Sequence, residues 1–287
     1  MNTEQVKHWC QLYSQPPVNA PTIKPLLMGI LNVTPDSFSD GGKYLHQEKA
    51  VEHALKMVSE GADVIDIGGE STRPGAEPIS VDEELARVMP VIEQLRKENE
   101  VCISIDTSKP EVMEAALLGG ASIVNDVKGF QGNAFLAKAA KYDAIVCLMH
   151  MQGEPQSMQE SPRYTHHVVD EINLFFKERI AVCTAFGIKP TRLILDPGFG
   201  FGKTVKHNLQ IVRQFDRFHA HSLPVMLGVS RKSTIGAVLN TPVDKRLSGS
   251  LAITVFSALK GLAMIRTHDI AETNQALLMV QAIQEDA

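Results

Sequence analysis

The sequence has 287 residues, of which 44% are hydrophobic and 21% charged, and its formal net charge is −5. These values are typical of a globular chain with a large core, and the length fits either two average domains or one α/β barrel. The negative balance and the lack of a long basic run exclude nucleic acid as an expected partner. Arginines, lysines and backbone amides placed locally would have to hold any bound anion.

The sequence contains four cysteines, Cys10, Cys102, Cys147 and Cys183. They form neither a CxxC pair nor a metal-ligand spacing with histidine, so we expect no disulfides and a cytoplasmic location. The first residues lack the apolar core of a secretory signal. The longest apolar stretch, 247–265, is interrupted by Lys260 and Gly261, which predicts a buried helix and a short strand and no membrane span.

Short apolar runs predict eight buried strands, at 27–32, 64–68, 101–106, 122–126, 144–150, 193–196, 224–230 and 263–268. Helical periodicity between them predicts helices at 48–59, 81–97, 110–118, 164–186, 208–219, 247–258 and 270–283. Continuous apolar runs are typical of parallel strands that helices cover on both faces. Because no linker divides the chain, the pattern predicts one domain of the α/β class, a single (β/α)8 TIM barrel. An open, doubly wound sheet is the alternative.

Polar residues gather at the carboxyl ends of the predicted strands. They are Asn32, Asp66, Glu70, Asp106, Asn125, Asp126, His150, Asp196, Ser230 to Lys232, Arg266 and His268. In a barrel these ends meet at one mouth, so we expect the functional site there.

Four of these residues, Asp106, Asn125, Asp196 and Lys232, are suited to binding a flat heterocycle. Carboxylates can bind its amino-imine edge, the amide a ring nitrogen or carbonyl, and the lysine a carbonyl oxygen. Buried charges must pair with one another or with a ligand, because unpaired burial is costly. Mutual pairing that only stabilises the barrel mouth is the alternative.

A second set of residues predicts an anion site. Ser71–Gly75 follows the second predicted strand and Arg266–His268 ends the eighth, so barrel closure would bring both near Asn32. The guanidinium fork suits phosphate oxygens, and an asparagine oxygen is a hard ligand for a Mg²⁺ that keeps most of its waters. Either arginine, Arg73 or Arg266, taken alone is better explained by a surface ion pair, and it is the two together that favour the anion site.

Two glycine-containing segments complete the candidate site. Gly228–Gly236 predicts a strand end that enters a helix, where Ser233 can cap exposed N–H groups and a carboxylate can bind them. The segment 198–202 lacks the context of a phosphate-binding glycine loop, so it predicts a rigid wall lined by phenylalanines.

Eight motifs follow one another along the chain: MGILNVTPDSFSDGG at 28–42, IGGESTRPGA at 67–76, ISIDT at 103–107, ND at 125–126, LMHMQG at 148–153, LDPGFGFGK at 195–203, GVSRKS at 228–233 and RTHD at 266–269. In this order and at these intervals they resemble the motifs of the dihydropteroate synthases. The resemblance covers 26–287 as a catalytic barrel and leaves 1–25 as a variable lead-in.

The resemblance implies a transferase of folate biosynthesis with Mg²⁺ as cofactor. Its small-molecule substrates would be 6-hydroxymethyl-7,8-dihydropterin diphosphate and 4-aminobenzoate, and its products 7,8-dihydropteroate and diphosphate. It also implies inhibition by sulfonamides and a homodimer, whose contact we expect on the apolar helices predicted at 247–258 and 270–283.

Carried onto this sequence, the resemblance implies a role for each site residue. The residues expected to bind the pterin are Asp106, Asn125, Met149, Asp196, Phe201 and Lys232. Those expected at the diphosphate are Asn32, Thr72, Arg73, Arg266, Thr267 and His268, with Asn32 also holding the metal. Those expected at the aminobenzoate are Phe38, Thr72, Pro74, Phe199, Lys232 and Ser233. The residues expected to carry catalysis are Asp106, Lys232, Arg266 and His268.

The chemistry implied by the resemblance predicts a dissociative, SN1-like displacement. An electron-rich dihydropterin can delocalise the positive charge at its departing methylene, and an aryl amine needs no general base. The glycine pairs 41–42 and 68–69 predict hinges for loops that close over the diphosphate.

Two alternatives remain. One is a pterin-binding barrel that transfers a folate methyl group to a corrinoid protein, and the other is a barrel without catalysis that serves as a scaffold. The predicted diphosphate set argues against the first, and the charged pocket residues argue against the second.

Overall fold

The computed structural model describes residues 1–13, 24–34, 43–71, 77–129, 132–153, 158 and 162–285. Four residues expected in the site, Phe38, Thr72, Arg73 and Pro74, lie outside the described residues, as does the glycine pair 41–42.

Eight parallel strands form one sheet in the order β6-β5-β4-β3-β2-β1-β8-β7. They are β1 Leu26–Asn32, β2 Val64–Gly68, β3 Cys102–Asp106, β4 Ile123–Asp126, β5 Ile145–Met149, β6 Leu193–Asp196, β7 Met226–Gly228 and β8 Met264–Thr267. A bridge between Leu195 and Val225 joins β6 to β7 and closes the ring. The predicted (β/α)8 barrel is confirmed, because each strand pairs with its neighbours in the sequence and β1 pairs with β8.

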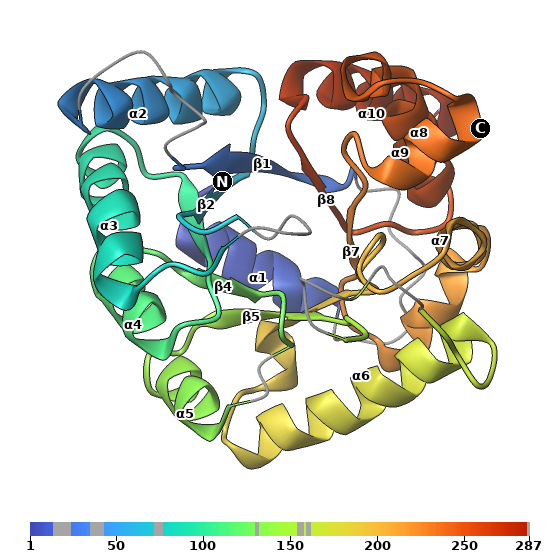
Figure 1. The fold of residues 1–287 in the computed structure, drawn as a ribbon, viewed down its shortest axis with the longest axis horizontal. Helices are drawn as coiled ribbons and strands as arrows, with labels where there is room; N and C mark the ends of the chain where they lie inside the picture. The colour runs from blue at the N-terminus through green and yellow to red at the C-terminus, as the bar shows by residue number, and fades with distance from the viewer. Residues whose placement is uncertain are drawn as a thin grey trace.

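Helices surround the strands in a ring (Figure 1). They are α2 Lys43–Ser59, α3 Val81–Glu98, α4 Pro110–Leu118, α5 Asn133–Lys141, α6 Val168–Ala185, α7 Val205–Arg213, α8 Ser233–Leu239, α9 Leu247–Ala258 and α10 Ile270–Glu285, with 3-10 turns η2 Pro190–Arg192, η3 Phe215–His221 and η4 Val243–Lys245. The periodic stretch 208–219 divides between α7 and η3, and α5 was not predicted. Among the described helices, none combines the length and apolarity needed to cross a membrane.

Local signals fix where the helices that flank the site begin. The Ser80 hydroxyl accepts a hydrogen bond from the Glu83 amide and caps the start of α3, whose first turn is acidic. Pro110 opens α4, at a position where its missing N–H has no intrahelical partner to lose. Both helices therefore start next to the carboxyl ends of the strands.

The inside of the barrel changes from apolar to polar along the strands. Near the strand starts the buried side chains include Met28, Val64, Cys102, Ile123, Ile145, Cys147, Ile194, Met226 and Met264. One or two pleats further on, the buried or half-buried positions are Asp66, Ser104, Asp106, Asn125, Asp196 and Arg266. Because side chains alternate along a strand, these polar groups point into the same channel as the apolar layer beneath them.

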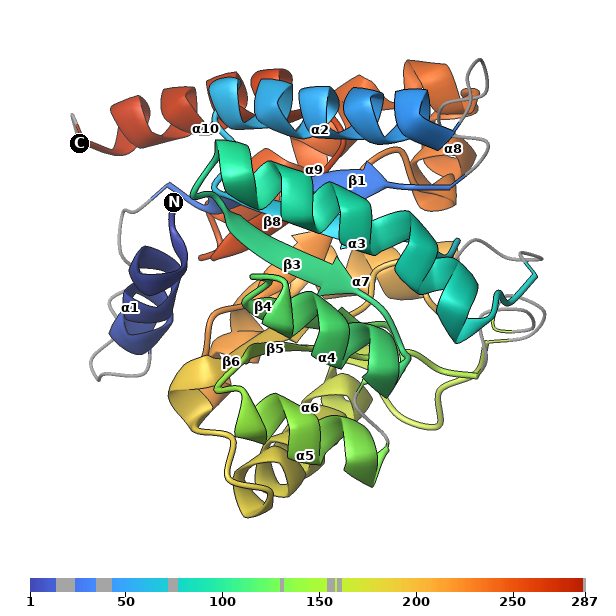
Figure 2. The ribbon, with the colours of Figure 1, turned by 90° about the vertical axis from the view of Figure 1, so that its left-hand side faces the viewer.

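Helix α1, Thr3–Tyr13, lies at the end where the strands begin, apart from the ring of helices (Figure 2). Its buried residues, among them Val6 and Trp9, join the apolar cluster of the barrel interior. The Met1 carbonyl accepts a hydrogen bond from the Cys102 amide at 2.8 Å, and the Thr3 and Ser122 hydroxyls lie 2.6 Å apart. Helix α1, which belongs to the predicted lead-in 1–25, thus covers the end of the barrel where the strands begin.

All four cysteines are described by the structure, are buried, and are not joined in disulfides. Burial raises the pKa of the Cys10 and Cys102 thiols to about 12. The thiols are therefore packing groups and are not reactive at neutral pH.

Candidate active site at the carboxyl ends of the strands

Arg266 ties together the polar groups of three strands inside the barrel. Its Nε donates to Asp66 Oδ2 at 2.6 Å, and its Nη2 donates to Asp106 Oδ2 at 2.8 Å. The Asn125 amide donates to the same Asp66 oxygen at 3.2 Å. The structure therefore brings Asp106, Asn125 and Arg266 together as expected, and adds Asp66, for which no role was predicted.

The charge on Asp106 is poorly stabilised despite its arginine partner. Burial is the main reason that its pKa rises from 3.8 to about 7, and the Arg266 guanidinium opposes the rise. The neighbouring carboxylates of Asp66, Asp126 and Glu84 add to it. A cationic ligand would relieve this excess of negative charge.

Several buried oxygens in the same channel have unmet hydrogen-bonding capacity. Asp66 Oδ1, Asn125 Oδ1 and Ser104 Oγ are buried and make no hydrogen bond to any residue that the structure describes. Such groups are rare in folded proteins and cost free energy. The channel is thus rich in acceptors that fit a ligand with several N–H donors.

Asp196 and Lys232 lie on the opposite wall, at the ends of β6 and β7. Asp196 is 5% exposed, and its Oδ1 accepts from the Gly198 amide at 2.8 Å. Burial raises the pKa of Asp196 and lowers that of Lys232 to about 8, although each charge favours the other. The Lys232 ammonium lies 4.4 Å from the centre of the Phe201 ring and donates to the Phe199 carbonyl. Phe201 is therefore placed to form a flat wall, as predicted.

A buried lysine holds this wall, and sequence reasoning gave it no role. Lys203 is 3% exposed, and its ammonium lies 3.0 Å from His150 Nδ1 while it donates to the carbonyls of Phe201 at 2.9 Å and His150 at 3.3 Å. Burial lowers the pKa of Lys203 well below its usual value, and burial together with the Lys203 charge does the same for His150. Gly198 has φ +67, and a Cβ there would lie 1.8 Å from the His150 carbonyl oxygen. The sequence signal was the lysine that ends the LDPGFGFGK motif.

The rim beside Arg266 is built by the turn after β7. Ser230 Oγ accepts from the His268 amide at 3.2 Å and lies 3.0 Å from His268 Nδ1. Arg231 has φ 55, donates its amide to Ser250 Oγ and pairs with the Asp269 carboxylate. The exposed His268 side chain thus lies at the mouth, where it was expected.

Met149 and Asn32 also lie where the sequence predicted. Met149 is 3% exposed and pairs in register with Asp196 at the ends of β5 and β6. Asn32 is the last residue of β1, half-buried, and pairs in register with Gly68. Among the described residues no group of three or more His, Cys, Asp or Glu side chains is arranged to hold a metal. A single amide oxygen fits Mg²⁺ that takes its other ligands from water and phosphate, and does not fit a metal caged by protein.

Three expected residues are placed differently from the prediction. Thr267 is 3% exposed, accepts from the Asp269 amide and lies 3.5 Å from the Thr273 hydroxyl, so its side chain faces α10. The alternation that points Arg266 into the barrel necessarily turns its neighbour outward. Phe199 is 0% exposed in the core between barrel and helices, so only its carbonyl reaches the mouth. Ser233 is the first residue of α8 and not its cap, which is Lys232.

The glycine pair 68–69, predicted as a hinge, is closely packed in the structure. Gly68 is the last residue of β2, in register with Asp106. Gly69 packs so closely on α3 that a Cβ there would lie 2.8 Å from Val88 Cγ1. Neither glycine has a positive φ.

Comparisons with known proteins find relatives over most of the chain. The model of a family described as pterin binding enzymes matches residues 28–268. The dihydropteroate synthase of Escherichia coli is 51% identical over 258 residues, 90% of this chain and 91% of that protein. The enzyme of Haemophilus influenzae is 46% identical over 90% of this chain and 94% of that protein.

Solved structures are similar over the same length. The Yersinia pestis dihydropteroate synthase in a sulfonamide drug complex has a TM-score of 0.86 and 48% identity, covering 91% of this chain and 95% of that one. The Xanthomonas albilineans enzyme with 4-aminobenzoic acid has a TM-score of 0.86 and 44% identity, covering 92% of this chain and 94% of that one. The Xanthomonas albilineans enzyme has also been solved in complex with 7,8-dihydropteroate, with a TM-score of 0.83 and 42% identity over 92% and 95% of the two chains.

Proposed function

This chain belongs to the dihydropteroate synthases, within the pterin-binding enzyme family, and from this premise we propose how its barrel mouth works. It is a transferase that joins 6-hydroxymethyl-7,8-dihydropterin diphosphate to 4-aminobenzoate. The alternative of a methyl-transferring barrel has no support among these relatives, which are synthases.

The pterin binds in the barrel channel between two acidic walls. The single observation that carries this assignment is that the buried oxygens Asp66 Oδ1 and Asn125 Oδ1 make no hydrogen bond to any described residue, beside the carboxylates of Asp106 and Asp196. A pterin ring offers N–H donors along one edge and a carbonyl that Lys232 can bind. Met149 and Phe201 lie where they can cover the ring faces.

The diphosphate lies at the rim, where cations and hydroxyls gather. Arg266 Nη1 makes no hydrogen bond to the residues that the structure describes, so one arm of the fork remains for a phosphate oxygen. His268 stands beside it, and Thr72 and Arg73 are proposed to complete the clamp. Thr267 would contribute through its main chain, because its side chain faces α10. Asn32 would hold Mg²⁺, which supplies charge neutralisation to the leaving diphosphate when bound.

The residues of the channel favour an SN1-like displacement. As the bond to diphosphate breaks, positive charge spreads over the pterin methylene and ring, and the carboxylates of Asp106 and Asp66 lie close to one another beneath it. Preorganised charges of this kind lower the barrier most where charge develops. Arg266 orients Asp106 on its inner side and faces the leaving group on its outer side.

The aminobenzoate is proposed to approach from the rim, with its carboxylate at the start of α8 near Ser233. Phe38, Thr72 and Pro74 would line this second site, together with Lys232. We infer that sulfonamides compete there, as the drug complex of the Yersinia pestis enzyme suggests. We also propose a cytoplasmic homodimer.

The test is a turnover assay with the purified chain. Incubation with the dihydropterin diphosphate, Mg²⁺ and 4-aminobenzoate should release diphosphate and form 7,8-dihydropteroate in equal amounts, measured by chromatography. Asp106→Asn should lower kcat about 100-fold or more, because the cation loses its nearest negative charge. Formation of no dihydropteroate by the unaltered chain would contradict the proposal.

A further inference from the structure

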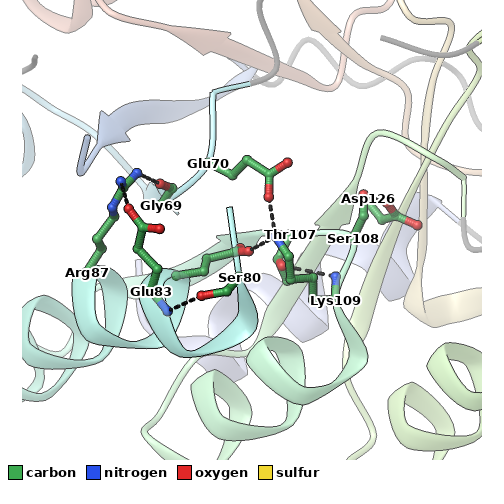
Figure 3. A network of polar contacts seen from close by, with 10 residues as sticks. Gly69, Glu70, Ser80, Glu83, Arg87, Thr107, Ser108, Lys109 and Asp126 are labelled. Carbon is green, nitrogen blue, oxygen red and sulfur yellow. Dashed lines mark hydrogen bonds and ion pairs between the residues drawn. The ribbon is translucent and has the colours of Figure 1, made fainter. Parts of the chain in front are cut away.

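One lysine outside the pocket joins three elements that border it (Figure 3). Lys109 comes from the turn between β3 and α4, just before Pro110. Its ammonium hydrogen-bonds Glu70 Oε2, two residues beyond the end of β2, and Glu84 Oε2 at 2.5 Å, on the first turn of α3. A single cation therefore fixes the exit of β2 against α3 and the β3–α4 turn.

The energetics make this contact hard to replace. The Glu84 side chain is 1% exposed, and its Oε1 makes no hydrogen bond to any described residue. A buried carboxylate without a partner is strongly destabilising, so Glu84 depends on Lys109. Burial lowers the pKa of Lys109, but the two carboxylates outweigh it and leave that pKa raised, so the lysine stays charged.

The two residues after β2 are held by α3 as well. Arg87 Nη1 donates to the Gly69 carbonyl at 2.7 Å while its Nη2 pairs with Glu83. A Cβ on Gly69 would lie 3.0 Å from Glu84 Cγ, so the backbone at Gly69 packs against α3 with no room for a larger side chain. Gly69 is thus fixed through its carbonyl and Glu70 through its carboxylate.

We propose that Lys109 is a positioning residue for the second half of the reaction, because it anchors Glu70 where the chain leaves the barrel toward Thr72, Arg73 and Pro74. This inference rests on the proposed function, in which those three residues meet the diphosphate and the aminobenzoate.

Lys109 makes no direct contact with the residues proposed to bind the pterin ring, although its partner Glu84 adds, as the smallest of several contributions, to the negative charge around Asp106. Lys109 contacts neither Asn125 nor Asp196 nor Lys232 through any hydrogen bond or ion pair of the described residues. Removal of the Lys109 ammonium should therefore raise the KM for the aminobenzoate and leave the dissociation constant of a pterin without diphosphate nearly unchanged. General damage to the barrel would weaken both.

The experiment compares Lys109→Met with the unaltered chain in two measurements. We expect the KM for 4-aminobenzoate to rise about tenfold, since small misplacements of binding groups have effects of this size. The dissociation constant of 6-hydroxymethylpterin, measured by calorimetry, should stay within about twofold. Lys109→Arg should restore part of the loss, because a guanidinium can also bind two carboxylates.

Lys138→Met is the matched control, since Lys138 pairs with Glu114 at a similar exposure, 27% against 21%, away from the mouth. It should leave both constants unchanged. If Lys109→Met does not fold, Glu70→Gln removes the same anchor at a side chain that is 29% exposed. An unchanged aminobenzoate KM, or an equal weakening of pterin binding, would overturn the inference. A lack of turnover in the unaltered chain would instead count against the proposed function.

Discussion

At the scale of single residues, the site is built from charges that the fold makes costly. Asp66 is 0% exposed and shares one oxygen between Arg266 and Asn125. Burial raises the pKa of Asp106 to about 7, and the carboxylates around it add to the rise. Such perturbed groups in a cleft are typical of functional sites.

The pH dependence of turnover should report this arrangement. If Asp106 must be ionised to stabilise the cation, kcat/KM should fall as the pH drops through about 7. Asp66→Asn removes one of the negative neighbours that raise the Asp106 pKa, so the acidic limb should move to lower pH by about one unit. A pH profile of kcat/KM for both forms measures the shift.

Asp143→Asn is the control, because that exposed carboxylate pairs with Arg192 at 2.5 Å and is not among the groups that raise the Asp106 pKa. Its profile should match the unaltered chain. The prediction would be contradicted if the acidic side of the kcat/KM profile of Asp66→Asn stayed in place or moved to higher pH.

At the scale of elements, the sequence predicted the strands well and the first helix not at all. Buried parallel strands are readable because both faces are apolar, and β2 and β6 have the predicted bounds. Helix α1 was missed because its order depends on the barrel floor against which Val6 and Trp9 pack. Tertiary packing of this kind leaves little trace in local sequence.

The same reasoning explains which site residues were found. Asp106, Asn125 and Asp196 were predictable because each is a polar residue at the end of an apolar run. Lys203 and Lys109 were not, because their partners come from other parts of the chain. The side chain of Thr267 lies outside the expected site, because the alternation of β8 that points Arg266 into the barrel turns Thr267 toward α10.

Trp9→Ala should test the role of α1. Trp9 is 4% exposed, and emptying a buried site of this size costs about 3–5 kcal/mol of unfolding free energy. The urea midpoint followed by circular dichroism should fall accordingly. Because α1 lies at the end opposite the mouth, kcat of the folded protein should stay unchanged.

Leu12→Ala serves as the control on the same helix, since Leu12 is 45% exposed. It should change the unfolding free energy by no more than about 0.5 kcal/mol. A loss of turnover in folded Trp9→Ala would show that the floor also shapes the site.

At the scale of the whole molecule, α9 and α10 expose several large apolar side chains. The exposed side chains on or just after these helices are Phe256, Leu259, Leu278, Met279 and Ile283, which are 46–67% exposed. Apolar patches of this kind mark interfaces between proteins. They support the proposed homodimer.

Leu278→Glu should shift the assembly toward monomers, because a symmetric contact places the new charge in the interface twice. Sedimentation velocity measures the change. Leu118→Glu, at a side chain that is 71% exposed on α4, should leave the sedimentation coefficient unaltered. Identical behaviour of the two variants would exclude this face as the contact.

The closure of the ring between β6 and β7 has a consequence for how a ligand affects the protein. These described strands share one bridge, and the Leu195 amide donates to the Pro224 carbonyl at 2.9 Å. Asp196 is the last residue of β6, and Lys232 follows β7. A pterin bound to both residues would therefore bridge the two strands where they share few hydrogen bonds. Hydrogen–deuterium exchange of the amides in β6 and β7 should then slow when 6-hydroxymethylpterin is added, more than in β2 and β3, where the sheet is already continuous.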